Sequence, residues 1–283
     1  MQHSLVKEWL ILGAILFTCF CNPAIAANKP LKTTTVVAPT TVVMPQSFTI
    51  CTDTNFQFPF SFMKDQKPIG LHIDIIDAAL HSLGITPRYE PTIWSGCLDR
   101  TKAGSVDAVA TAAYMDERAL YLYYPLDALN NDKSSWRLTQ VQYKVITSLL
   151  DNNGNVNHYQ FDGHIENIPE PVRVPTGYFI VHDLQKARLK VQEGATSLDN
   201  FKSLLKDRTG SVVDLAEVAE QLSLQPQFAN QFHIHPQPLV VKSYYLAFSK
   251  GGHVNLAQAQ KVWDAIAKVR EDKALMAMFL KKY

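Results

Sequence analysis

From Ser47 onward, short apolar segments typical of strands alternate with amphipathic segments typical of helices. Phe48–Cys51 predicts the first strand, and Leu71–Leu83 predicts a helix because apolar residues recur there at helical spacing before Gly84. Val106–Thr111 predicts another small strand. This alternation indicates an α/β fold with parallel strands and flanking helices.

A second block of the same kind follows a polar loop at residues 130–135. It contains a predicted strand at Gln140–Leu149, a predicted helix at Asp214–Leu222 and an extended run at Leu239–Phe248. Asn255 is a typical cap for one more amphipathic helix. The 283 residues are enough for two modest cores.

The amino end has the features of a secretory signal. An almost wholly apolar run from Trp9 to Cys21 is followed by Pro23 and by the small-residue site at 24–26. We expect a signal peptide at residues 1–26, cleavage after Ala26, and a Thr-, Val- and Pro-rich linker at residues 27–46. A retained membrane anchor and a lipoprotein are the alternatives, but the run is short for a bilayer span. The mature protein is then expected in the periplasm.

Cleavage would leave only Cys51 and Cys97 of the four cysteines. Disulfides form and persist outside the cytoplasm. Cys51 ends the first predicted strand and Cys97 opens the helix after the second, and these two strands should be neighbours in the sheet. We therefore expect a disulfide, and two buried free thiols are the alternative. The spacing fits neither a zinc site nor a Cys-x-x-Cys redox site.

Charge and motifs exclude several functions. The formal net charge of +1 gives no surplus for nonspecific binding to nucleic acid. The sequence lacks a nucleophile elbow, a phosphate loop, a dinucleotide fingerprint and a His-Glu-x-x-His motif, so we expect no cofactor. His233 and His235 would share one face of a strand, but surface histidines explain them better than a metal site.

An ordered series of short segments carries a family resemblance. The segments are Asp53 with Phe56, Pro59-Phe60-Ser61-Phe62, Gly70-Leu71-His72-Ile73-Asp74, Trp94, Gly104-Ser105-Val106-Asp107-Ala108, Met115-Asp116-Glu117-Arg118, Val172 to Gly177, Ser243 to Lys250 and Lys282-Tyr283. In this order they resemble the family 3 extracellular solute-binding proteins, the periplasmic amino-acid-binding type of ABC importers.

The resemblance implies a periplasmic-binding-protein-like fold with two lobes, two hinge crossings and a ligand in the cleft between the lobes. Lobe one would comprise residues 47–129 and 243–283, and lobe two residues 132–242. The crossings would lie near Leu129–Ser135 and Val240–Tyr244. Such a protein would be a monomer that closes on its ligand and docks on the membrane permease subunits of an importer.

The resemblance also assigns candidate ligand-binding residues. Arg118 would grip a carboxylate, since its guanidinium offers two parallel charged hydrogen bonds. Phe56 and Trp94 would sandwich the ligand, and Gly177 and Tyr178 would offer backbone N–H groups to an anion. The remaining candidates are the hydroxyls of Thr111 and Tyr114 and the acids Asp53 and Asp214, with Glu217 as the alternative to Asp214 for an amino group.

Two other functions stay open. The first is a dehydratase-like enzyme on the same scaffold, which would use a cleft carboxylate from Asp53, Glu117 or Asp214 as acid or base. The second is a signalling or assembly protein that keeps the fold without the ligand. We expect the solute receptor rather than an enzyme.

Overall fold

The computed structural model describes residues 42–129 and 133–283. The predicted signal peptide and most of the predicted linker lie outside these residues. The elements, in chain order, are β1 (Ser47–Asp53), β2 (Phe62–Lys64), β3 (Lys67–Ile69), α1 (Leu71–Ser82), β4 (Thr86–Thr92), α2 (Trp94–Lys102), β5 (Ala108–Ala113), α3 (Asp116–Ala119), β6 (Leu122–Tyr123), η1 (Leu126–Leu129), β7 (Thr139–Ser148), η2 (Ile165–Asn167), β8 (Val172–Pro175), α4 (Phe179–Lys186), β9 (Val191–Gly194), α5 (Ser197–Asp207), β10 (Ser211–Leu215), α6 (Ala216–Ser223), β11 (Phe232–Ser249), α7 (Leu256–Glu271) and α8 (Lys273–Leu280).

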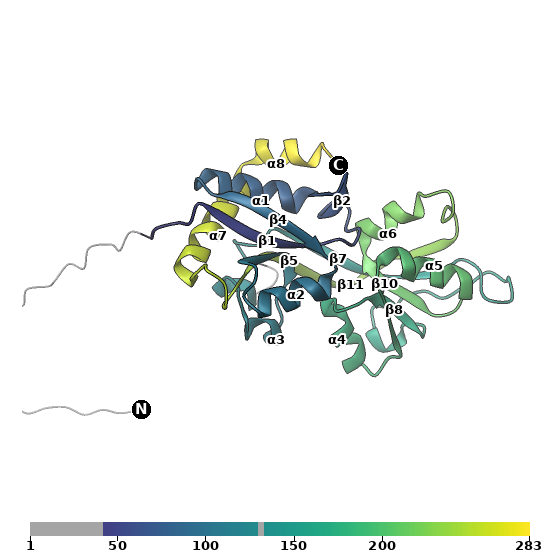
Figure 1. Cartoon of the computed structure of the whole chain (residues 1–283). Coiled ribbons are helices and arrows are strands. Elements are labelled where there is room, and N and C mark those ends of the chain that lie inside the picture. Colours follow the sequence, from purple (N-terminus) through teal and green to yellow (C-terminus); the bar gives the residue numbers. More distant parts are fainter. Residues whose placement is uncertain (1–41, 130–132) are drawn as a thin grey trace, which may run out of the picture. The chain divides into compact units, whose positions relative to one another are not determined.

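The main sheet has the strand order β4-β1-β5-β11-β7-β10-β8-β9, with β6 also paired to β11, and β2 and β3 form a separate two-stranded sheet. The three strands at each end are parallel, whereas β5, β11, β7 and β10 pair antiparallel. Figure 1 shows α1, α7 and α8 at one end of this sheet and α4, α5 and α6 at the other. The predicted α/β class and two-lobed fold are confirmed. We use the predicted bounds to name lobe one (47–129 and 243–283) and lobe two (described from residue 133 to 242).

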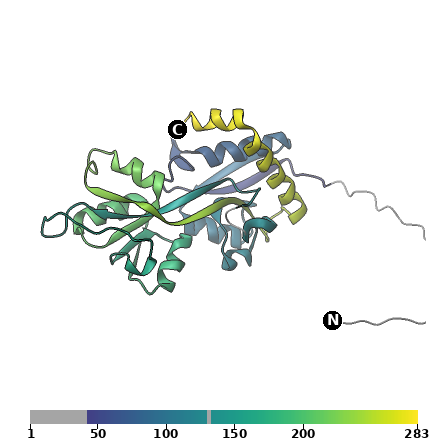
Figure 2. The same cartoon turned by 180° about the vertical axis from the view of Figure 1, so that it is seen from behind.

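The long strands β7 and β11 join the two lobes. β11 pairs with β7 from Phe232 to Tyr244 and with β5 from Tyr244 to Phe248, so one strand contributes to both lobes. Figure 2 shows this ribbon crossing the molecule from behind. The second crossing between the lobes is therefore part of a hydrogen-bonded ladder.

Alternation along β1 explains how lobe one buries both faces of its sheet. Phe48 and Ile50 pack under α1 and α7, whereas Cys51 faces α2 on the other side. The structure pairs Cys51 with Cys97 of α2, with the Cα atoms 5.4 Å apart. This disulfide ties the end of β1 to the helix that begins at Trp94.

Two predicted elements need correction. Asp214 lies in β10 and the following helix begins at Ala216, because residues 211–215 are all buried and pair with β7 and β8. β11 begins at Phe232, well before the predicted Leu239, and its register shifts around Pro238, which cannot donate to the ladder. By contrast, Asn255 caps α7 through a complete capping box with Gln258, as its position predicts.

Within the described residues, the model has no helix with the length and apolarity of a bilayer span.

Candidate functional site

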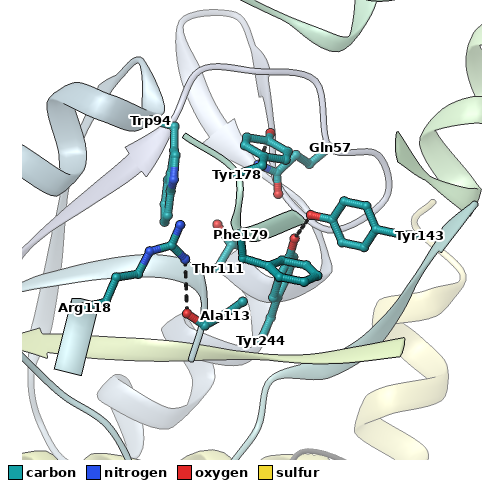
Figure 3. A pocket seen from close by; sticks show the side chains of 9 residues that line it. All are labelled: Gln57, Trp94, Thr111, Ala113, Arg118, Tyr143, Tyr178, Phe179 and Tyr244. Atoms are coloured by element: carbon teal, nitrogen blue, oxygen red, sulfur yellow. Dashed lines mark hydrogen bonds between the residues drawn. The ribbon is translucent and has the colours of Figure 1, made fainter. Parts of the chain in front are cut away.

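A narrow cavity of about 10 Å³ lies between the lobes, close to the space that one water molecule needs (Figure 3). Its walls combine one cation, one amide, the hydroxyls of a threonine and three tyrosines, and several aromatic rings. The lining residues are Gln57, Trp94, Thr111, Ala113, Arg118, Tyr143, Tyr178, Phe179 and Tyr244. Both lobes and both crossing strands therefore contribute to one site.

Arg118 supplies the positive charge of this site. It lies on the short helix α3 and is only 5% exposed. Its Nη1 donates to the carbonyl oxygen of Ala113 in lobe one at 3.1 Å, and its Nη2 donates to that of Gly177 in lobe two at 2.9 Å. No ion pair with Arg118 is present among the described residues. The guanidinium is thus buried against neutral acceptors only.

Trp94 and Gly177 complete the contact around the arginine. The Arg118 guanidinium carbon lies 5.2 Å from the Trp94 ring centroid, a cation–π distance. The Trp94 indole N–H donates to the Gly177 carbonyl at 3.0 Å, so one carbonyl of lobe two accepts from two side chains of lobe one. Gly177 has a φ of +73°, a left-handed conformation that glycine adopts without steric cost.

Tyr178 inserts its hydroxyl into a buried polar cluster of lobe one. The hydroxyl donates to Asp53 Oδ2 at 3.1 Å and accepts from the amides of Asn55 and Gln57, both at 2.7 Å. Burial raises the pKa of Asp53 despite the hydrogen bonds from Asn55 N, Tyr178 and Gln57. Asn55 also bonds with Ser197 of lobe two. These contacts hold the lobes together.

Thr111 owes its position to an irregularity in β5. Two residues of β5 stand opposite one residue of β11 between the Tyr245–Ala112 and Ala247–Val109 pairs, which is a β-bulge. Thr111 has a φ of +62°, a strained conformation for a β-branched residue. Such strain is common at ligand sites. The Thr111 hydroxyl donates to the adjacent carbonyl of Ala110 at 2.6 Å.

Asp214 lies in lobe two beside this site without lining the cavity. It is 1% exposed, and its Oδ1 accepts from the Leu215 N–H at 2.8 Å. Its Oδ2 has no hydrogen-bond partner in the described part of the chain. Burial raises the pKa of Asp214 to about 6, although a hydrogen bond from Ser197 opposes the shift. The carboxylate thus has an unused acceptor.

The structure brings Trp94, Thr111, Arg118 and Tyr178 together around the cavity. The side chains of Phe56 and Tyr114, and the backbone N–H groups at 177 and 178, have other partners than the sequence predicts. Phe56 packs on Phe58 and Phe62 in an aromatic cluster of lobe one, so it does not face Trp94 across the cavity. Tyr114 donates its hydroxyl to Asp116 and lines a separate hollow.

The predicted backbone donors also have other partners. The Gly177 N–H donates to the Glu193 carboxylate at 2.9 Å, and the Tyr178 N–H donates to the Pro175 carbonyl at 3.3 Å. Because the turn points its carbonyl toward lobe one, lobe two presents an acceptor there instead of a pair of donors.

Sequence reasoning missed five cavity residues, which are Gln57, Ala113, Tyr143, Phe179 and Tyr244. The hydroxyls of Tyr143 and Tyr244 lie 2.5 Å apart and join the two crossing strands (Figure 3). Alternation of Val141, Tyr143 and Val145 along the predicted strand marks one buried face and could have identified Tyr143. Gln57 and Phe179 adjoin predicted positions but carry no separate signal.

His233 and His235 lie close together, with ring centroids 4.3 Å apart. His235 is buried and bridges Thr147 and the Phe161 N–H, so it fastens the loop after β7. Burial lowers the pKa of His235 to about 4. In the described ranges, no three His, Cys, Asp or Glu residues are placed to hold a metal ion.

Residues 48–125 match the family model for bacterial extracellular solute-binding proteins, family 3. The resemblance to this family is confirmed. No curated protein sequence matches the chain.

Solved structures of similar fold span most of the chain. An ancestral arginine-binding protein bound to glutamine has a TM-score of 0.63 and 18% identity, and the match covers 85% of this chain and 99% of that one. A histidine kinase sensor domain with similarity to periplasmic binding proteins has a TM-score of 0.67 and 15% identity, with 83% and 96% covered. The ancestral amino-acid-binding protein AncCDT-1, a precursor of cyclohexadienyl dehydratase, has a TM-score of 0.63 and 17% identity. The match covers 84% of this chain and 95% of that one. At these identities the matches show the fold.

Proposed function

We propose that this protein is a periplasmic receptor that captures a small carboxylate-bearing solute, an amino acid or a related molecule, for an ABC importer. The ligand binds in the cleft between the lobes, and the closed receptor docks on membrane permease subunits. The confirmed family resemblance supports the receptor class. The cleft geometry supports the ligand class.

The observation that carries this proposal is the buried Arg118 guanidinium at the cavity wall. A buried cation is costly unless an anion or several strong acceptors compensate it. Two neutral carbonyl oxygens do so here, one from each lobe. A ligand carboxylate would accept two parallel charged hydrogen bonds from the same group, a stronger arrangement than the carbonyl of Gly177 offers.

One buried acid from each lobe suits the amino group of such a ligand. Asp214 Oδ2 is an acceptor without a partner in the described residues, and Asp53 holds the Tyr178 hydroxyl. The charges of Asp53 and Asp214 both contribute to the raised pKa values of Tyr178 and Tyr244, so the two acids lie near the same part of the cleft. An ammonium group could therefore displace the tyrosine hydroxyl.

Ligand entry into this cavity requires the lobes to separate, because the cavity holds only about one water molecule. Separation would break the contacts of Gly177 with Arg118 and Trp94 and those of Tyr178 with lobe one. The ligand would then supply replacements for these contacts and allow the lobes to close again.

The proposal is tested by screening amino acids and small carboxylates for thermal stabilisation, followed by titration calorimetry with the best compound. Arg118→Ala should lower its affinity by about two to three decades, since an unpaired buried carboxylate typically costs about 3 to 5 kcal/mol. Arg118→Lys should recover only part of the loss, because an ammonium lacks the planar fork. Arg88→Ala removes an exposed arginine of β4 and serves as the matched control.

Mass spectrometry of the compound after incubation separates a receptor from an enzyme. The receptor returns its ligand unchanged. The dehydratase-like alternative would consume it, with a cleft carboxylate from Asp53, Glu117 or Asp214 as acid or base. Equal affinity in the parent and Arg118→Ala would refute the carboxylate assignment.

A second function is favoured by the direct contacts across the cleft. Tyr178, Asn55 and the Gly177 carbonyl already join the lobes through the protein's own groups. A signalling or assembly protein without a ligand would need such a closed form. Failure of every compound in the screen to stabilise the folded protein would favour this second function over the receptor.

A further inference from the structure

A second polar hollow, of about 270 Å³, lies where the chain leaves lobe one toward β7. The segment 133–137 forms one wall, and the end of α7 forms the other (α7 is labelled in Figure 1). Its lining residues are Lys133, Ser134, Ser135, Arg137, Ala267, Arg270 and Glu271. None of them belongs to the cleft between the lobes.

Two arginines converge on one turn in this hollow. Arg137 Nη1 donates to the Ser134 carbonyl, and Arg270 Nη1 donates to the adjacent Ser135 carbonyl at 2.9 Å. Burial lowers the pKa of Arg270, and the charge of Arg137 lowers it further, so the guanidinium groups sense one another. Like charges repel at such a position unless an anion lies between them.

The basic side chains of this hollow outnumber the nearby acids that the structure describes, Glu271 and Asp127, by one, and the charge of Glu271 partly offsets the effect of Arg137 on Arg270. Glu271 is the only acid among the lining residues, against the positive charges of Lys133, Arg137 and Arg270. Asp127, which is also nearby, accepts from the Ser134 hydroxyl and the Ser135 N–H with its two oxygens. Among the described residues, neither arginine forms an ion pair.

Other arginines of the chain provide a contrast. Arg100 pairs with Glu90, and Arg173 pairs with Asp207 at 2.7 Å. Guanidinium groups bind phosphate-type oxyanions through paired hydrogen bonds, and exposed lysine and serine side chains can add further donors.

We propose that Arg137 and Arg270, with Lys133 and the Ser135 hydroxyl, form a binding site for a tetrahedral oxyanion of the inorganic phosphate type. The bound anion bridges the segment that leads into β7 and the end of α7. It therefore fastens the start of the crossing strand to lobe one. This site is separate from the cleft and does not depend on the ligand proposed there.

Titration calorimetry with inorganic phosphate, in chloride buffer of matched ionic strength, tests this site. The parent protein should give a saturable heat at one site. Arg137→Gln and Arg270→Gln should each weaken phosphate binding by at least about tenfold, the loss expected when a charged hydrogen-bonding partner is removed. Circular dichroism in chloride identifies any variant that fails to fold, and the other arginine variant then decides.

Two control variants make the test specific. Lys268→Gln removes an exposed charge from the same helix outside the hollow and should leave the phosphate affinity unchanged. Arg118→Ala should also bind phosphate like the parent, because Arg118 belongs to the cleft. The absence of a saturable heat in the parent, an equal loss in Lys268→Gln and Arg270→Gln, or a loss in Arg118→Ala would each overturn the proposal.

Discussion

In lobe one, Asp53 ends a strand that a disulfide ties to α2, whereas in lobe two Asp214 lies near the end of a strand in a region without cysteines. The two buried acids also differ in their partners. Asp53 accepts hydrogen bonds from Asn55, Gln57 and Tyr178. Asp214 has one oxygen without a partner in the described residues.

This difference indicates how each lobe contributes to the cleft. In lobe one, Asp53 is held in place by three hydrogen-bond donors at the end of a cross-linked strand, while Gln57 Oε1 in the same cluster has no partner among the described residues. Lobe two has an unused acceptor and supplies Tyr178 to complete the network of lobe one. Lobe one is thus the preorganised half of the site, and lobe two is the half whose hydrogen bonds can be exchanged.

The largest expected effect concerns the cross-link. The double variant Cys51→Ala/Cys97→Ala should lose about 4 kcal/mol of unfolding free energy, because the disulfide closes a loop with a sequence separation of 46. Urea unfolding measures the loss. Adding a reductant should destabilise the parent but not the double variant. A loss below about 1 kcal/mol would show that packing alone preorganises lobe one.

The pH dependence of stability should distinguish the two acids. The folded pKa of Asp214, about 6, lies above its ordinary value of 3.8. Between these values the unfolded chain releases the proton first, so stability falls as pH rises through this window. Across this window the shifted pKa of Asp214 should lower the free energy of unfolding by about 2 to 3 kcal/mol, and Asp214→Asn should abolish this pH dependence.

Unfolding free energies at pH 4 and pH 7 check this prediction. Asp214→Asn should be more stable than the parent at pH 7. Asp53→Asn should gain less unfolding free energy. Burial also raises the pKa of Asp53, but the three donors around it need the carboxylate oxygens that the substitution would remove in part. Equal gains in the two variants would contradict the contrast between the acids.

Tyr178→Phe should weaken the exchangeable contacts between the lobes. Removing the hydroxyl leaves buried polar groups of Asn55, Gln57 and Asp53 with fewer partners, which should cost about 1 to 3 kcal/mol. Small-angle scattering should also show a larger radius of gyration. Tyr114→Phe is the matched control, since its hydroxyl bonds the exposed Asp116. An unchanged radius in Tyr178→Phe would count against this role.

The smallest expected effect is at Gly177. Gly177→Ala should lower the free energy of unfolding by about 1 kcal/mol, because the φ of +73° at position 177 is unfavourable for a residue with a Cβ atom. Gly154→Ala provides the control, since Gly154 has a φ of +82° and open space around it. The added Cβ at Gly177 would touch Trp94 at an ordinary 3.4 Å, so the two variants should lose similar amounts. A much larger loss at Gly177 would indicate that the interlobe contact tolerates no adjustment.

Local patterns predicted the elements that depend on local physics. The helical spacing after Gly70 and the Asn255 cap gave α1 and α7 nearly to the residue. The early part of β11 was missed because Pro236 and Pro238 are unfavourable in strands, yet pairing with β7 continues around them. Asp214 was assigned to a helix because its strand has only five residues and leads directly into α6.

The cleft was predictable only in part for a related reason. Arg118, Trp94 and Tyr244 belong to segments with a family pattern, but Tyr244 meets Tyr143 only when two distant strands pair. Phe56 was misplaced because an aromatic residue gives the same signal in a ligand site and in a cluster with Phe58 and Phe62. Sequence patterns indicate which face of an element is buried, but they do not indicate which other element packs against that face.

The Trp94 indole gives the protein an intrinsic fluorescent reporter. It is 6% exposed and donates to a carbonyl of the opposite lobe, whereas the Trp263 indole donates to the Leu246 carbonyl within lobe one. The Trp136 indole, at the start of the residues assigned to lobe two, donates to Asp264 of α7. Separation of the lobes must therefore hydrate Trp94 and move its ring away from the Gly177 carbonyl, while the surroundings of Trp263 stay the same. The emission spectrum of the unlabelled protein thus registers the distance between the lobes directly.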